Sequence, residues 1–107
     1  MALSIEVRDS GDWRIIDAVG EVDLMTSPQL RDAVLASVKE GGNVGVNLSG
    51  AEYMDSSGVA TLVEGLKSAS EKGQQFVLVR PSGRVMKVLE LARLDTLFDI
   101  REAIEGD

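Results

Sequence analysis

Hydrophobic and polar positions alternate with a period of two in the first part of the chain. Residues 3–8 alternate apolar and polar side chains, which is typical of a half-buried strand. Residues 13–22 are again rich in β-branched and apolar side chains, and the turn-forming residues 9–12 separate the two runs. We therefore expect an antiparallel hairpin, in which Gly20 marks a bulge or the close approach of another backbone.

Three later segments repeat their apolar residues at helical spacing. Thr26 or Ser27 can cap the first helix, Pro28 suits its first position, and the Gly-Gly pair at 41–42 ends it. The second helix follows residue 58 and reaches about residue 72, and the third opens at the Pro-Ser-Gly sequence of residues 81–83. Each predicted helix has one apolar face, so each is expected to pack on a sheet.

Short apolar runs between these helices predict further strands at residues 44–48, 76–79 and 97–100, followed by a short final helix at 101–104. Strands that alternate with helices indicate parallel, right-handed β-α-β connections. The predicted fold class is α/β: a single mixed sheet with an N-terminal antiparallel hairpin, then parallel β-α units, with helices packed on it. We expect one domain over residues 1–107.

The composition limits the size of the core and the expected compartment. The 107 residues, 44% of them hydrophobic, suffice for one core. The chain has no apolar run of about 20 residues that could cross a membrane, and its first residues lack the features of a signal peptide. We therefore expect a cytoplasmic protein that does not associate with a membrane.

The absence of particular residue types excludes several kinds of chemistry. The chain has no Cys and no His, so it offers no thiolate nucleophile, no imidazole base and no Cys or His metal ligand. Its net charge of -7 repels the phosphate backbone of a nucleic acid, so direct nucleic-acid binding is not expected. We expect no cofactor and no enzymatic activity.

The segment Tyr-Met-Asp-Ser-Ser-Gly at residues 53–58 lies where the second predicted helix begins. The simplest role for Ser56 is a helix N-cap, whose side chain accepts a backbone hydrogen bond. A helix N-terminus also carries partial positive charge and free N–H groups, so a phosphate on Ser56 could be accommodated there. Gly58 removes a side chain beside the hydroxyl and is expected to leave it accessible.

We expect a flat outward strip on the same helix, formed by small and polar residues: Ser57, Thr61, Glu64, Gly65 and Ser68. Such a strip suits the docking of another protein. Glycine inside a helix lowers helix stability by about 1 kcal/mol relative to alanine. A close contact between the helix and another element at Gly65 would explain why glycine is present there. That contact could equally come from another element of the same domain, and both interpretations remain open.

The order of these motifs resembles a known family. Residues 20–23 (Gly-Glu-Val-Asp) followed by a helix, residues 46–48 (Val-Asn-Leu) and residues 53–59 (Tyr-Met-Asp-Ser-Ser-Gly-Val) closely resemble the STAS domain of bacterial anti-sigma factor antagonists, also called anti-anti-sigma factors. The resemblance covers nearly the whole chain. One mild departure is Ala60, which stands where the family commonly has Gly and is expected to affect helix packing more than phosphorylation.

The resemblance implies a phosphorylation switch. Ser56 would be phosphorylated by a GHKL-type serine kinase that is itself the anti-sigma factor, and a PP2C-type phosphatase would restore it. Asp23 and Asp55 would flank Ser56 near the kinase active site, although each could instead be an ordinary turn or capping carboxylate. Ser57 matches a family position that is not the usual acceptor. We expect Ser57, Gly58, Thr61 and Gly65 to contact the partner, and the protein to be a monomer or a weak dimer.

Other functions remain open at this stage. STAS domains also occur as small subunits of lipid-transport ABC systems, where they dock on the ATPase, and in stress-sensing complexes. Those transporter versions often lack the Asp-Ser-Ser-Gly pattern, which this chain retains at residues 55–58. Nucleotide binding ranks low because the chain has no glycine-rich phosphate loop.

Overall fold

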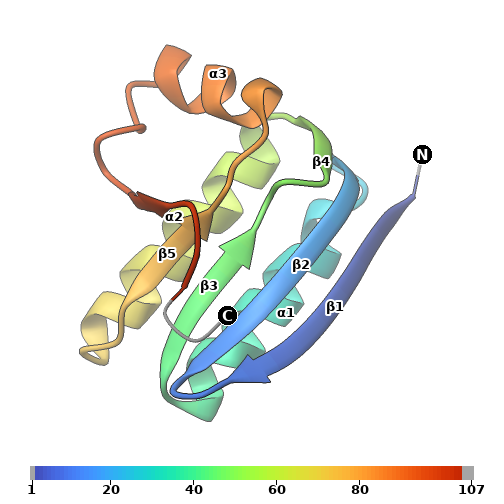
Figure 1. The fold of residues 1–107 in the computed structure, drawn as a ribbon. Coiled ribbons are helices and arrows are strands. Elements are labelled where there is room, and N and C mark those ends of the chain that lie inside the picture. Colours follow the sequence, from blue (N-terminus) through green and yellow to red (C-terminus); the bar gives the residue numbers. More distant parts are fainter. Residues whose placement is uncertain (1, 105–107) are drawn as a thin grey trace.

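The computed structural model describes residues 2–104 and shows one mixed sheet with helices packed on it (Figure 1). The strands are β1 (Leu3–Ser10), β2 (Trp13–Val22), β3 (Asn43–Asn47), β4 (Ala51–Met54), β5 (Phe76–Val79) and β6 (Asp99–Arg101), and the helices are α1 (Ser27–Glu40), α2 (Ser56–Glu71) and α3 (Gly83–Leu91). The strand order is β1-β2-β3-β5-β6, and β4 pairs with β2. The predicted α/β class and the mixed sheet are confirmed.

The pairing within the sheet follows the predicted pattern. β1 and β2 form the antiparallel hairpin, while all other pairs are parallel. β2 pairs with β3 along its first half and with β4 along its second half, and the register shifts at Gly20. Gly20 has a φ of 117°, and a side chain there would collide with the carbonyl oxygen of Ala2. The predicted bulge and close approach at Gly20 are therefore both present.

Two elements differ from the prediction. Strand β4 was not predicted, because it has only four residues and two of them, Glu52 and Tyr53, are exposed, so the apolar period is too short to recognise. The final helix predicted at residues 101–104 is wrong. Arg101 instead ends strand β6, and Ile104 is buried against the sheet in irregular backbone.

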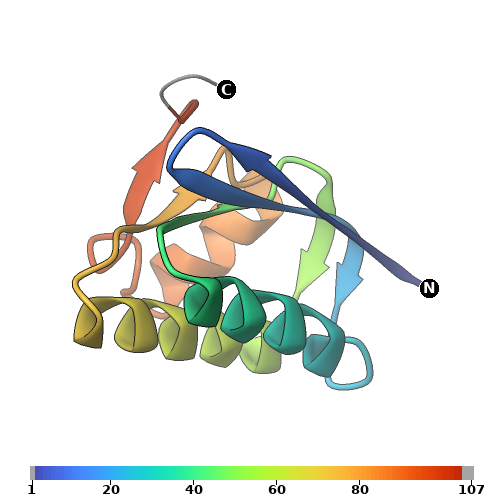
Figure 2. The same cartoon turned by 90° about the horizontal axis from the view of Figure 1, so that it is seen from below.

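Each face of the sheet has its own apolar cluster. All three helices lie on the same face, and Figure 2 shows α1 and α2 side by side beneath the strands. On the opposite face a smaller cluster consists of Trp13, Ile15, Val77, Val79 and Ile104. The C-terminal segment therefore covers part of the face that has no helix. No helix among residues 2–104 is long and apolar enough to cross a membrane.

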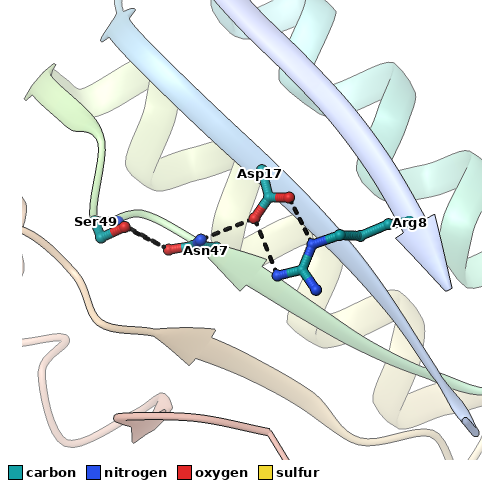
Figure 3. Close-up of polar contacts among 4 residues, drawn as sticks. All are labelled: Arg8, Asp17, Asn47 and Ser49. Atoms are coloured by element: carbon teal, nitrogen blue, oxygen red, sulfur yellow. Dashed lines mark hydrogen bonds and ion pairs between the residues drawn. The ribbon is translucent and has the colours of Figure 1, made fainter. Parts of the chain in front are cut away.

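Polar contacts join three strands on the face without helices (Figure 3). Arg8 Nε donates to the Asp17 carboxylate at 2.8 Å, and Asn47 Nδ2 donates to the same carboxylate at 2.8 Å. Asn47 Oδ1 accepts in turn from the Ser49 hydroxyl at 2.8 Å. Burial opposes ionisation of Asp17, but the hydrogen bonds from Arg8 and Asn47 outweigh it, so the pKa of Asp17 is lowered. These contacts tie β1, β2 and β3 together.

Candidate functional site

Ser56 is the first residue of α2 and lies just beyond the end of β4. The backbone there is fixed by β2, because the Asp55 N–H donates to the Val22 carbonyl at 3.1 Å. The Ser56 side chain is exposed, and its hydroxyl makes no hydrogen bond to any residue from 2 to 104. Ser56 is thus held on a rigid element with its reactive oxygen facing solvent.

Asp55, not Ser56, caps the helix, which corrects the simplest prediction for Ser56. The Asp55 backbone is extended, and its Oδ1 accepts from the Ser57 N–H at 2.9 Å and from the Ser57 hydroxyl at 2.5 Å. The Asp55 carboxylate therefore accepts both donors of Ser57 and satisfies one of the backbone N–H groups at the helix start. The Ser57 hydroxyl is consequently engaged while the Ser56 hydroxyl is not.

The Asp55 carboxylate also stays ionised. The hydrogen bond from the Ser57 side chain lowers the pKa of Asp55, although partial burial opposes this shift. Backbone N–H groups of Ser57, Gly58 and Leu24 lower the pKa further. The contribution from Leu24 matters for the geometry, because Leu24 belongs to the loop between β2 and α1. That loop therefore lies beside the start of α2.

Asp23 organises this neighbouring loop. Its Oδ1 accepts from the N–H groups of Met25 at 2.9 Å and Thr26 at 3.0 Å, as a turn-forming aspartate does. The Thr26 hydroxyl accepts from the Asp23 N–H at 2.9 Å and lies 2.8 Å from the Glu21 carbonyl, to which it donates. Asp23 thus has the turn role that the sequence left open. It directly follows Val22, whose carbonyl accepts the Asp55 N–H, so Asp23 and Asp55 lie near each other.

The loop exposes two large apolar side chains that the sequence reasoning missed. Leu24 is 74% exposed and Met25 is 85% exposed. The sequence does contain a sign of this exposure: two apolar residues stand between Asp23 and Thr26, in a turn that is usually built from polar residues. Together with Ser56 and Asp55 they form what we call the Ser56 surface.

The predicted outward strip of α2 is wrong for two of its members. Thr61 is buried and donates to the Ser57 carbonyl at 3.1 Å. A side chain on Gly65 would stand 2.6 Å from Val34 Cγ1 and 2.8 Å from the Phe76 ring. Gly65 therefore allows α1 and β5 to approach α2, which is the internal alternative left open by the sequence.

Gly58 also faces inward. A side chain on it would stand 2.7 Å from Met54 Cγ and 2.8 Å from Val22 Cγ1. Its role is to let the first turn of α2 lie close to β4 and β2, rather than to clear space around the Ser56 hydroxyl. Ala60, one turn after Ser56, is exposed, so its difference from the family's common Gly falls on the surface and not in the packing.

The fold agrees with comparisons to known proteins. The family model described as "Mlab, STAS domain" matches residues 5–102. The chain belongs to the STAS domain family.

Similar proteins include several that are named anti-sigma factor antagonists. The anti-sigma-B factor antagonist of Listeria monocytogenes is 31% identical over 109 residues, with 100% of this chain and 95% of the relative covered. The crystal structure of an anti-sigma factor antagonist from Mycobacterium paratuberculosis matches with a TM-score of 0.83 at 23% identity, over 97% of this chain and 89% of that one. The Bacillus cell fate determinant SpoIIAA in its phosphorylated form matches with a TM-score of 0.71 at 22% identity, over 97% and 94% of the two chains.

Proposed function

We propose that this protein is an anti-sigma factor antagonist whose activity is switched by phosphorylation of Ser56. In the unphosphorylated state it binds an anti-sigma factor through the Ser56 surface and so releases the sigma factor. The anti-sigma factor is a GHKL-type serine kinase that phosphorylates Ser56, and a PP2C-type phosphatase reverses the modification. All of this takes place in the cytoplasm.

The observation that carries the proposal is the difference between two adjacent hydroxyls. Ser56 is exposed with an unengaged hydroxyl, whereas the Ser57 hydroxyl donates to Asp55 at 2.5 Å. A kinase must align the acceptor oxygen with the γ-phosphate of ATP, and a hydroxyl already held by a carboxylate is less available for that alignment. The surroundings therefore favour Ser56 over Ser57 as the acceptor.

The charges around Ser56 give phosphorylation two opposite effects. The partial positive charge at the N-terminus of α2 favours a phosphate there, so the domain is expected to stay folded. The ionised Asp55 lies directly beside it, and a phosphate would add about -1.5 to -2 charge to that surface. A partner shaped to fit a neutral hydroxyl would then meet concentrated negative charge, which disfavours the complex.

Leu24 and Met25 supply the apolar part of the same surface. Exposed apolar side chains next to a polar centre are typical of a protein interface. Burying each one against the anti-sigma factor would strengthen the complex, and a charge placed beside them would be costly to desolvate. The docking contacts and the switch thus occupy one surface.

Phosphorylation of two matched variants tests the acceptor. The protein, Ser56→Ala and Ser57→Ala are each incubated with ATP and a GHKL-type anti-sigma kinase that phosphorylates the wild type, and intact masses are measured. We expect one added phosphate on the wild type and on Ser57→Ala, and none on Ser56→Ala. Stoichiometric phosphorylation of Ser56→Ala would rule out the assignment.

Binding to the same anti-sigma factor tests the switch. Ser56→Ala is expected to bind constitutively and Ser56→Asp to lose binding. Leu24→Ser and Met25→Ser are each expected to weaken binding about tenfold, as residues near the centre of an interface do. Leu91→Ser is the matched control, because Leu91 is 77% exposed but lies at the end of α3. Equal losses from Leu24→Ser and Leu91→Ser would argue against this surface.

A further inference from the structure

Strand β1 forms the long free edge of the sheet. It pairs with β2 on one side over eight residues without a register shift, and the strand order places it at the end of the sheet. Both views show no described element beyond it (Figures 1 and 2). The strand also contains no proline. An edge of this kind is a template for pairing with another strand.

The direction of the backbone groups along β1 follows from its first pair. Leu3 lies opposite Gly20, but the Gly20 N–H donates to the Gly50 carbonyl at 3.0 Å, so this pair is not hydrogen-bonded. Hydrogen-bonded and non-bonded pairs alternate along an antiparallel ladder. Ile5, Val7 and Asp9 therefore direct their N–H and C=O groups away from β2. Gln29 Nε2 donates a hydrogen bond to the outward-facing carbonyl of Leu3 at 3.1 Å.

The side chains around the middle of this edge are self-complementary. If two β1 strands pair antiparallel about a two-fold axis at Val7, each Val7 lies opposite the other and exchanges both backbone hydrogen bonds with it. Glu6 of each copy then lies directly opposite Arg8 of the other, on the face without helices. Oppositely charged residues facing each other across two strands stabilise the pairing, and the symmetry provides this contact twice.

Pairing with Arg8 of a second copy would be electrostatically favourable for Glu6. Within the chain it lies opposite Asp17 in the ladder, and like charges directly opposite destabilise a sheet. Arg8 is placed diagonally and pairs with Asp17 at 2.8 Å, while Glu6 makes no ion pair with residues 2–104. In the pair, the Arg8 guanidinium of the second copy, which also bonds that copy's own Asp17, would lie next to this carboxylate.

We propose that β1 pairs with β1 of a second copy of this chain, centred on Val7, and joins two sheets into one. The net charge of -7 on each copy opposes association, so the dimer forms reversibly and only at higher protein concentration. Ser56, Leu24 and Met25 are not on this edge. The dimer would therefore carry two Ser56 surfaces, and it does not depend on the function proposed for them.

Disulfide trapping tests the two-fold pairing directly, because the chain has no cysteine of its own. Val7→Cys places two thiols across the axis at a separation that a disulfide can span. Val19→Cys is the matched control, since Val19 is 51% exposed against 45% for Val7 but lies on β2. Under mild oxidation we expect Val7→Cys to cross-link at least about tenfold faster than Val19→Cys. Equal rates would overturn the proposal.

Charge exchange gives a second test that needs no cross-link. In sedimentation velocity over a concentration series, Glu6→Arg is expected to raise the dimer dissociation constant about tenfold, because two attractive contacts become repulsive. The double variant Glu6→Arg with Arg8→Glu should restore wild-type association, because opposite charges again face each other across the two strands. The arginine at position 6 then lies opposite Asp17 of the same chain. Circular dichroism confirms the fold of each variant. A wild type that stays monomeric at all concentrations, or no restoration by the double variant, would refute the pairing.

Discussion

At the scale of single residues, three neighbours, Asp55, Ser56 and Ser57, have different roles. Asp55 holds the start of α2, Ser57 satisfies that carboxylate, and Ser56 remains exposed. A residue can be a switch only if its modification does not destroy the fold, and this division meets the requirement. The proposed phosphate site and the structural cap are adjacent but separate.

The stability of cap variants should reflect this division. Asp55→Ala is expected to lower the free energy of unfolding by about 1 kcal/mol, because it removes an N-cap acceptor. Ser56→Ala should change it by less than about 0.5 kcal/mol, since the hydroxyl has no partner among the described residues. Urea unfolding measures both. Equal losses for the two variants would mean that Ser56 shares in capping.

Asp17 should make stability depend on acid pH. Its pKa is lowered in the folded state from an ordinary value of 3.8, so its ionised form stabilises the fold above that value. That contribution is lost as the pH falls through the folded-state pKa. Asp17→Asn should therefore be less stable than the wild type near neutral pH, and the difference should shrink steadily below pH 3.8.

Urea unfolding midpoints of both proteins across the acid range measure this effect. Asp9→Asn is a suitable control, because Asp9 pairs with Arg14 on the surface and its side chain is 71% exposed. Its effect should be small at every pH. A difference between wild type and Asp17→Asn that stays constant down to acid pH would contradict the prediction.

At the scale of elements, α2 is fixed in place by glycines that face inward. Gly58 allows its first turn to approach β4 and β2, and Gly65 allows its middle to approach α1 and β5. Small residues on a helix face thus reflect close packing within the domain. This close packing is what keeps the N-terminus of α2, and with it Ser56, at a constant position on the sheet.

Gly65→Ala should therefore destabilise the protein although alanine is the better helix former. The gain of about 1 kcal/mol in helix propensity is outweighed by overpacking, which costs about 1 to 3 kcal/mol. The new methyl group would stand 2.6 Å from Val34 Cγ1 and 2.8 Å from two atoms of the Phe76 ring. We expect a lower midpoint in thermal unfolding.

Gly83→Ala is the control for this experiment. Gly83 begins α3, and a side chain there would meet no atom within 4 Å. The same substitution should consequently leave the midpoint unchanged or raise it. If Gly65→Ala were as stable as Gly83→Ala, the packing role of Gly65 would be wrong.

At the scale of the whole molecule, the sheet is covered unequally. Three helices shield one face, whereas the other relies on the C-terminal segment, where Ile104 is only 2% exposed. Gly45 makes room for it, because a side chain at Gly45 would stand 3.1 Å from Ile15 Cδ1 and 3.4 Å from Ile104 Cδ1. Arg101 lies over the Trp13 ring at 5.7 Å from its centre.

Ile104→Ala should weaken this second cluster measurably. Removing a buried isoleucine side chain costs about 2 kcal/mol or more in the free energy of unfolding. Trp13, the single tryptophan, belongs to the same cluster, so its fluorescence should shift to longer wavelength as water gains access. Leu97→Ala, at a residue 50% exposed, should change neither property. An unshifted emission for Ile104→Ala would contradict the proposed cover.

The sequence by itself determined the order of most elements, because the periods of two and 3.6 in its apolar residues are local properties of the chain. It also placed Ser56 at the start of a helix, from the turn chemistry of residues 55–58. Strand β4 escaped detection because a pairing partner, not a local period, makes those four residues a strand. The final helix was wrong because burial of Ile104 on the sheet decides that segment.

Only the tertiary structure decided which residues face outward at the proposed site. Small side chains at Thr61 and Gly65 are compatible with either docking or internal packing, and the neighbouring helix and strand settle the choice. Likewise, nothing local brings the Leu24 loop beside Asp55, since that requires β2 and β4 to end side by side in the sheet. Local patterns fix what each segment can form, and contacts distant in sequence fix which of its faces is left for a partner.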